Sequence, residues 1–186
     1  MEIHENLEKY EVPIEKTMSE TIKTLYENVE KICTTNCKLN QIAMSICQSI
    51  GYNGFKRWHR YRSKEFYKLK LKLNSDIYSK FKIISDFKDY TVNYKPNSLE
   101  EHLKAWKNSN LNSIQELGEL QKTYFENTGT ECKIIRKLIN ILSKDYDKIC
   151  KYYTRFTESD WLTLDMHIVD DSIHEYYKCK EEKHER

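Results

Sequence analysis

Hydrophobic residues recur every three or four positions along most of the chain, which is the spacing of one face of an α-helix. The first such run follows Ser19, a predicted N-cap. Its apolar positions are Ile22, Leu25, Val29, Ile32, Leu39, Ala43, Ile46 and Ile50. The run ends at the segment 51–54, where Gly and Asn tolerate the left-handed backbone of a helix C-terminus. The pattern predicts one long helix that buries a single stripe.

Three further long helices are predicted by the same spacing. The second covers about residues 55–84, and the fourth carries apolar positions from Cys132 to Phe156. The third begins at Ser98, which forms a capping box with Glu101. A segment of fourteen residues, 85–98, separates the second helix from the third. Antiparallel neighbours are joined by roughly 2–8 residues, so this length predicts a crossover that returns along the whole bundle.

The segments outside these four helices are short. Residues 1–18 contain Pro13 and lack periodicity, so we expect an N-terminal arm. A shorter fifth helix is predicted from Trp161 to about Tyr177, and residues 178–186 are expected to form a charged tail. The sequence therefore predicts an all-α fold, with one helical bundle over residues 19–177.

Composition excludes several other classes of protein. The 186 residues include 4 Gly and 2 Pro, too few for the turns of an all-β fold or for a Gly-rich phosphate loop. Because 31 basic residues face 29 acidic ones, the net charge of +2 gives no general attraction to nucleic acid or membrane. No apolar run reaches the roughly 18 residues of a membrane span, and no secretory signal opens the chain. We therefore expect a cytoplasmic protein.

The chain has six cysteines and no CxxC pair. They are Cys33, Cys37, Cys47, Cys132, Cys150 and Cys179. Cys33 and Cys37 share a helix face and could form half of a zinc site, but no matching Cys or His pair lies nearby in the sequence. We favour the interpretation that the cysteines are small buried hydrophobic residues in a reducing compartment.

The predicted fifth helix is the segment richest in metal-ligand types. His167, Asp171 and His174 share one helix face, and two imidazoles with a carboxylate suit a divalent transition metal. The alternative is a solvated helix in which His–Asp pairs contribute a few tenths of a kcal/mol each. We favour this alternative, and keep the three residues as a candidate metal site.

The start of the second helix is strongly basic. A possible anion-binding face there comprises Arg57, Arg60, Arg62, Lys64 and Lys68. Aromatic residues interleave with them, as in some phosphate-backbone binding surfaces. The alternative, which we favour, is the solvated side of an amphipathic helix, so nucleic acid is not the expected partner. The six histidines are scattered in the sequence and indicate no nucleophile–histidine arrangement.

The order of elements resembles the ferritin family, bacterial non-haem ferritins in particular. Local matches are the segment 49–55 (Ser-Ile-Gly-Tyr-Asn-Gly-Phe), Ser98-Leu99-Glu100 and the segment 114–117 (Ile-Gln-Glu-Leu), and the likeness covers about residues 18–170. The resemblance implies a ferritin-like four-helix bundle with a long crossover and a short fifth helix. It also implies a homo-oligomer, either a cage of about 24 subunits or a co-assembly with an active ferritin-like subunit.

The family oxidises ferrous iron at a di-iron centre inside the bundle. By the resemblance, the ligand positions of that centre fall on Cys33, Phe66, Leu69 and Lys107. None of these is a carboxylate or an imidazole, although iron needs such ligands. The resemblance therefore implies a structural or iron-storage shell component without a ferroxidase centre, with iron stored or surface-bound and with no organic cofactor.

Two alternatives remain open at this point. A helical binding module for a protein or nucleic-acid partner would keep the bundle and lose the iron chemistry. A ferroxidase with relocated ligands would use the fifth-helix residues instead. We do not expect ferroxidase activity, because a shift of register on the second helix that recruited Glu65 would rotate every seam residue by about 100°.

Overall fold

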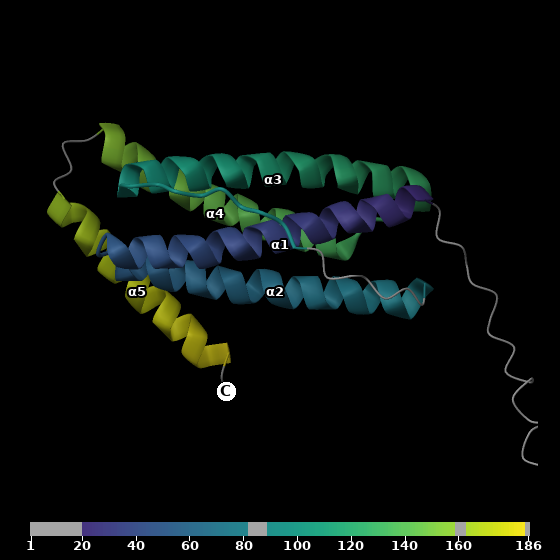
Figure 1. Cartoon of the computed structure of the whole chain (residues 1–186), viewed down its shortest axis with the longest axis horizontal. Coiled ribbons are helices and arrows are strands. Elements are labelled where there is room, and N and C mark those ends of the chain that lie inside the picture. Colours follow the sequence, from purple (N-terminus) through teal and green to yellow (C-terminus); the bar gives the residue numbers. More distant parts are fainter. Residues whose placement is uncertain (1–19, 82–88, 159–162, 185–186) are drawn as a thin grey trace, which may run out of the picture.

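The computed structural model describes residues 20–81, 89–158 and 163–184, and these residues form five α-helices and no strand. The helices are α1 (Glu20–Ser49), α2 (Asn53–Phe81), α3 (Leu99–Thr128), α4 (Lys133–Glu158) and α5 (Thr163–His184) (Figure 1). The expected arm at residues 1–18, the Ser19 cap and the start of the fifth helix at Trp161 lie outside the described residues. The all-α prediction is confirmed.

The four long helices form a bundle. α1 packs on α2, α3 packs on α4, and α1 also contacts α3. Figure 1 shows that α2 and α3 run in the same direction, and that residues 89–97 lead back to the start of α3. On the way this segment contacts α1 through Lys38 and Tyr90, and α3 through Tyr94 and His102. The long crossover is therefore confirmed over its described residues 89–97, and such a connection returns the chain to the end at which α2 began. Residues 82–88, which include the predicted end of the second helix and the start of the crossover, lie outside the described residues.

Local sequence signals fix the helix ends. At the start of α3 the Ser98 hydroxyl accepts a hydrogen bond from the backbone N–H of Glu101 at 3.2 Å. The Glu101 carboxylate accepts one from the N–H of Asn97 at 2.8 Å, which completes the cap. α3 ends at Gly129, whose φ of 68° is the left-handed conformation that glycine adopts without strain.

The N-terminus of α2 is capped by a side chain from α5. The backbone N–H groups of Gly54 and Phe55 donate to the Asp170 carboxylate at 2.8 and 2.7 Å. A Cβ at Gly54 would lie 1.8 Å from the Asp170 carbonyl oxygen, so glycine is what permits this approach. This contact attaches α5 to the start of α2.

α5 is longer than the sequence predicted, because it continues to His184 through the segment expected to be a charged tail. It packs on α2, and Tyr177 is buried with its ring stacked on Trp58 at 5.6 Å. Near its end Glu181 lies within 3.6–3.9 Å of Arg57, Arg60 and Lys64. These ion pairs hold the charged end against α2, so the segment keeps helical structure.

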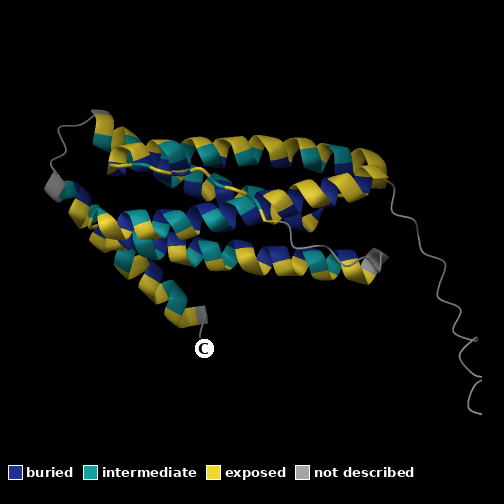
Figure 2. Cartoon of the chain, in the orientation of Figure 1, coloured by how far each residue is buried: buried dark blue, intermediate teal, exposed yellow. Residues whose placement is uncertain are grey.

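Figure 2 shows where the buried residues lie along the helices. Their hydrophobic side chains form two clusters. We call the first the aliphatic half; it includes Val29, Cys33, Phe66, Leu69, Leu138 and Leu142. We call the second the aromatic half; it includes Cys47, Phe55, Trp58, Leu103, Trp106 and Tyr177. Among the described residues, the crossover and α5 contribute to the aromatic half, through Tyr94, Met166 and Ile173, and not to the aliphatic half.

Among the described residues, no helix is long and apolar enough to cross a lipid bilayer.

Candidate metal centre

Cys47, His59 and His102 meet inside the aromatic half, one from each of α1, α2 and α3. Each is 0% exposed. One ligand atom from each lies within 4.8 Å of the other two. A metal site needs at least three ligand atoms close together. Among the described residues, the side chains of Cys47, His59 and His102 provide such a group.

The two histidines are members of a buried hydrogen-bond chain. His59 Nδ1 lies 2.7 Å from Asn40 Oδ1, and His59 Nε2 lies 3.0 Å from His102 Nε2. The other ring nitrogen of His102, Nδ1, lies 2.7 Å from the Tyr94 hydroxyl, which is also 3.1 Å from the His102 carbonyl oxygen. Cys47 Sγ lies 3.6 Å from His102 Nε2.

The neighbouring hydrogen bonds determine which ring nitrogen of each histidine carries the proton. The amide nitrogen of Asn40 donates to the carbonyl of Asn36 at 2.7 Å, so its Oδ1 faces His59 as an acceptor. His59 therefore carries its proton on Nδ1 and presents an unprotonated Nε2 to His102. Without a cation, Tyr94 donates to His102 Nδ1, and His102 Nε2–H donates to His59. Every polar atom in this arrangement has a partner, as burial requires.

Burial keeps the three groups neutral. It lowers the pKa of His102 to about 4 and, together with the neighbouring His102, lowers the pKa of His59 well below its ordinary value. It also raises the pKa of the Cys47 thiol to about 12, with a further contribution from Asp170. Neutral imidazole is the form that ligates metals, whereas the thiol must lose its proton on binding.

The positions that the ferritin resemblance assigns to iron ligands lie elsewhere. Cys33, Phe66 and Leu69 are 0%, 1% and 3% exposed and pack together in the aliphatic half. Lys107 lies outside that cluster, with its ammonium 4.3 Å from the centroid of the Tyr153 ring. These side chains present neither a carboxylate nor an imidazole, so they do not fit the oxygen-rich ligand set that iron requires. That they correspond to the ligand positions of the family stays a prediction.

Two buried carboxylates near the middle of the bundle are paired with cations. Glu30 lies 3.6 Å from Lys70. Asp145 accepts two hydrogen bonds from the Arg62 guanidinium, each at 2.5 Å, and one from Trp58 Nε1 at 3.3 Å. Because each charge is compensated by a protein cation, neither carboxylate needs a metal ion to be buried.

The three candidate ligands on α5 are spread along its outer side. His167 is exposed and its ring stacks on Tyr52, with the centroids 4.8 Å apart. Asp171 is exposed and His174 is half-buried. Their neighbour Asp170 points inward and caps α2. Within one chain these three do not converge on a common point as the Cys47 group does, and a site shared between symmetry copies stays a prediction.

The basic residues of α2 are divided between the interior and the surface. Arg62 is buried against Asp145 and also pairs with Glu65, so its guanidinium does not belong to an exposed face. Arg57, Arg60 and Lys64 surround Glu181 of α5, and Lys68 is exposed. The charge of this face is therefore partly neutralised by α5.

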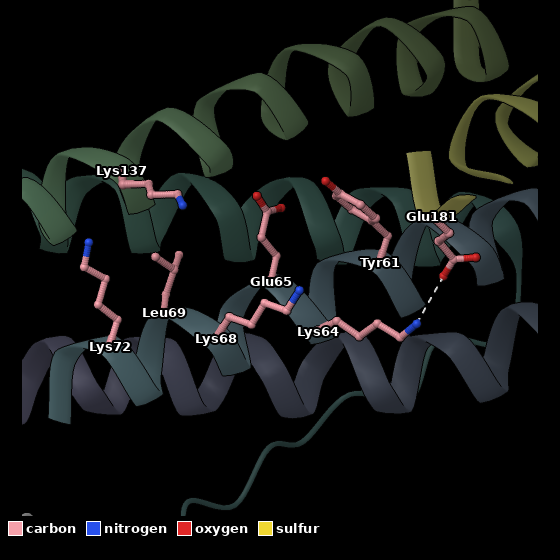
Figure 3. A pocket seen from close by; sticks show the side chains of 8 residues that line it. All are labelled: Tyr61, Lys64, Glu65, Lys68, Leu69, Lys72, Lys137 and Glu181. Atoms are coloured by element: carbon pink, nitrogen blue, oxygen red, sulfur yellow. Dashed lines mark ion pairs between the residues drawn. The ribbon is translucent and has the colours of Figure 1, made fainter. Parts of the chain in front are cut away.

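A groove of about 320 Å³ opens beside this face. It is lined by Tyr61, Lys64, Glu65, Lys68, Leu69, Lys72, Lys137 and Glu181. Figure 3 shows the lysines of α2 on one side of the groove and Lys137 of α4 on the other. The excess of ammonium groups favours an anionic occupant.

Sequence reasoning did not find the Cys47 group. A usable signal was the position of its members: His59 directly follows the seam residue Trp58, and His102 directly precedes the seam residue Leu103. A polar residue beside a seam position lies at the edge of the core, where neighbouring helices can bury it. The partners are 12 to 55 positions apart in the sequence, so only the fold brings them together.

Comparison with known proteins supports the fold. No protein-family model and no curated sequence matches the chain. Two solved structures, both described as a novel open pore ferritin from the hyperthermophilic archaeon Archaeoglobus fulgidus, are similar to it. The first has a TM-score of 0.68 at 14% identity and the second 0.57 at 15%; each match covers 85% of this chain and 98% of the other. The chain thus has a ferritin-like fold.

Proposed function

We propose that the chain is a ferritin-like subunit that serves as a structural or iron-storage shell component and has no ferroxidase centre of its own. The observation that carries this proposal is the packing of Phe66 and Leu69, which are 1% and 3% exposed inside the aliphatic half. A pair of iron ions there would have to displace packed core or face apolar side chains, and uncompensated buried charge is prohibitive. Iron would then be a stored or surface-bound cargo.

Assembly tests the shell part of the proposal. A cage of about 24 chains of 22.5 kDa would have a native mass of about 540 kDa, which light scattering measures directly. We expect either this mass or co-elution with an active ferritin-like subunit when the two are expressed together. A monomer or dimer that takes up no partner subunit would contradict the proposal.

Restoring ligands tests the assignment of positions. The triple variant Phe66→Glu, Leu69→His and Lys107→Glu should not oxidise ferrous iron rapidly while Cys33 is retained, because one side of the site would still lack a carboxylate. Oxygen consumption after addition of ferrous iron measures this. Rapid oxidation with fewer than the four changes would mean that the ligand positions are assigned in the wrong register.

A second function is favoured by the lysine-lined groove and the exposed part of the basic face. In this alternative the chain is a helical binding module for an anionic partner. Retention on a nucleic-acid column that falls with salt, and that is lost in Lys68→Gln/Lys72→Gln, which removes two charges of the groove, would support it. Arg62 is left unchanged in this test because its buried pair with Asp145 holds the fold. No retention at low salt would exclude nucleic acid as that partner.

A further inference from the structure

The aromatic half buries a thiol and two imidazoles at one point of its core, with no exposed surface on any of them. We propose that Cys47, His59 and His102 bind one Cu⁺ ion, through Cys47 Sγ and the two Nε2 atoms. The site lies within a single chain, so this proposal is independent of the shell and of the iron storage proposed above.

The spacing of the three atoms suits one ion. With the bond lengths of zinc sites as a measure, about 2.0–2.1 Å to nitrogen and about 2.3 Å to sulfur, ligand atoms are separated by about 3.3–3.8 Å in trigonal or tetrahedral geometry. The two Nε2 atoms are 3.0 Å apart, and Cys47 Sγ is 3.6 Å from His102 Nε2. The third pair, Cys47 Sγ and the ligand nitrogen of His59, lies within 4.8 Å. Small side-chain rotations would therefore bring all three atoms into coordination distance.

Both histidines already have the outer partners that metal-bound histidines use. A ligating imidazole donates its other ring N–H to an acceptor that fixes its orientation. His59 Nδ1–H donates to Asn40 Oδ1 at 2.7 Å. For His102 the acceptor is the Tyr94 hydroxyl, which can in turn donate to the His102 carbonyl at 3.1 Å. Tyr94 therefore accommodates either tautomer of His102, with and without an ion.

Charge and coordination number favour Cu⁺ over Zn²⁺. One thiolate and two neutral imidazoles make a site of net zero charge with Cu⁺, but leave a full positive charge with Zn²⁺ in a completely buried place. Zinc also requires a fourth ligand, and the described group contains three ligand residues. Thiolate ligands select soft ions such as Cu⁺.

Binding balances with the release of one proton. The Cys47 thiol loses its proton to solvent as the Cu–S bond forms. His102 changes tautomer: its Nε2 proton is given up, Nδ1 becomes protonated and donates to Tyr94, and the Tyr94 hydroxyl turns to the His102 carbonyl. The copper ion is neither oxidised nor reduced, so no further reactant is needed.

The test is an anaerobic titration of the full chain with Cu⁺ delivered from a coloured chelator. Because the site is closed, the titration is repeated on protein refolded with the Cu⁺ complex present. We expect one tightly held Cu⁺ per chain and a copper-edge X-ray absorption spectrum with one sulfur and two nitrogen neighbours. Tyr94→Phe should weaken binding by about 10–100-fold, because the outer partner of His102 is lost.

The six cysteines call for a matched control. Cys33 is buried like Cys47, and its thiol has the same raised pKa of about 12, again mainly from burial. It has no histidine in a comparable group among the described residues. Cys47→Ala should abolish the tight site, whereas Cys33→Ala should retain it. Helical circular dichroism confirms that both variants are folded.

Other results would overturn the proposal. Retention of the site in Cys47→Ala, or an absorption spectrum with sulfur neighbours only, would place copper on other thiols. Stoichiometric Zn²⁺ binding that Cu⁺ cannot displace would contradict the charge argument. If no tightly bound copper were found after refolding, the three residues would be only part of a buried hydrogen-bond network.

Discussion

The two halves of the bundle differ in which side chains they bury. The aliphatic half packs branched side chains around Phe66 and contains one buried ion pair, Glu30–Lys70. The aromatic half packs indole, phenol and imidazole rings around a continuous chain of polar atoms that reaches from Asn40 through His59 and His102 to Tyr94. The aliphatic half is stabilised mainly by exclusion of water from apolar side chains, and the aromatic half depends in addition on a continuous series of matched hydrogen bonds.

The ferritin resemblance predicts a metal site in the aliphatic half, whereas the side chains suited to bind a metal lie in the aromatic half. Cys33, Phe66 and Leu69, which the resemblance assigns to ligand positions, fall in the aliphatic half, which offers no imidazole and no unpaired carboxylate among its described residues. The aromatic half brings a thiol and two imidazoles together, which are softer ligands than iron centres use.

The largest predicted effect is loss of packing in the aliphatic half. Phe66→Ala should lower the free energy of unfolding by about 3–5 kcal/mol, because a cavity replaces a ring that is 1% exposed. Phe125→Ala removes the same ring from a position that is 54% exposed and should change stability by less than about 0.5 kcal/mol. Urea denaturation measures both; equal losses would mean that Phe66 is not part of a packed core.

Acid should act on the aromatic half. The pKa of His102 falls from 6.5 to about 4 on folding, so the unfolded chain binds a proton that the folded chain rejects. The contribution of neutral His102 to the free energy of unfolding is therefore fully present above about pH 6.5. It decreases by about 3 kcal/mol as the pH falls towards 4. His59 contributes in the same direction.

Urea denaturation of metal-free protein at several pH values measures this loss. His102→Gln should flatten the pH dependence, while His167→Gln, at an exposed position, should leave it unchanged. Stability that is constant between pH 6.5 and 4 in the unmodified chain would contradict the neutral histidine pair.

A smaller effect is expected from substitution of Asn40, whose Oδ1 accepts the hydrogen bond from His59 Nδ1–H. Asn40→Ala leaves the buried Nδ1–H of His59 without its acceptor and should destabilise the protein by about 1–3 kcal/mol. Asn127 is a matched control because its amide also donates to a carbonyl one turn earlier, at 2.8 Å, but on the surface. Thermal unfolding compares the two, and an equal loss in both variants would show that the chain of polar atoms contributes nothing.

Much of the fold was predictable from local signals. The heptad-like spacing and the Ser98 cap depend on neighbouring residues, and both agree with the structure, as does the long connection before α3 over its described residues 89–97. The extent of α5 was not predictable, because the ion pairs of Glu181 with α2 hold residues that have no apolar pattern of their own. The inward turn of Asp170 likewise depends on the free N–H groups of a distant helix end.

The candidate site was the least predictable part. His59 and His102 have no motif spacing, and their meeting depends on α2 and α3 both contacting α1 beside the returning crossover. Conversely, the α5 residues His167, Asp171 and His174 have a suggestive spacing but do not bring their ligand atoms together within one chain. Spacing along a helix predicts which residues share a face and does not predict what that face meets.

The central claim is that the aliphatic half contains no working di-iron centre. The direct measurement is oxygen consumption after ferrous iron is added to the anaerobic, unmodified protein and oxygen is then admitted. We predict a rate equal to that of buffer, because the positions assigned to the iron ligands offer Cys33, Phe66 and Leu69 instead of carboxylates and imidazole. A rapid burst of oxidation that saturates in proportion to protein would contradict it.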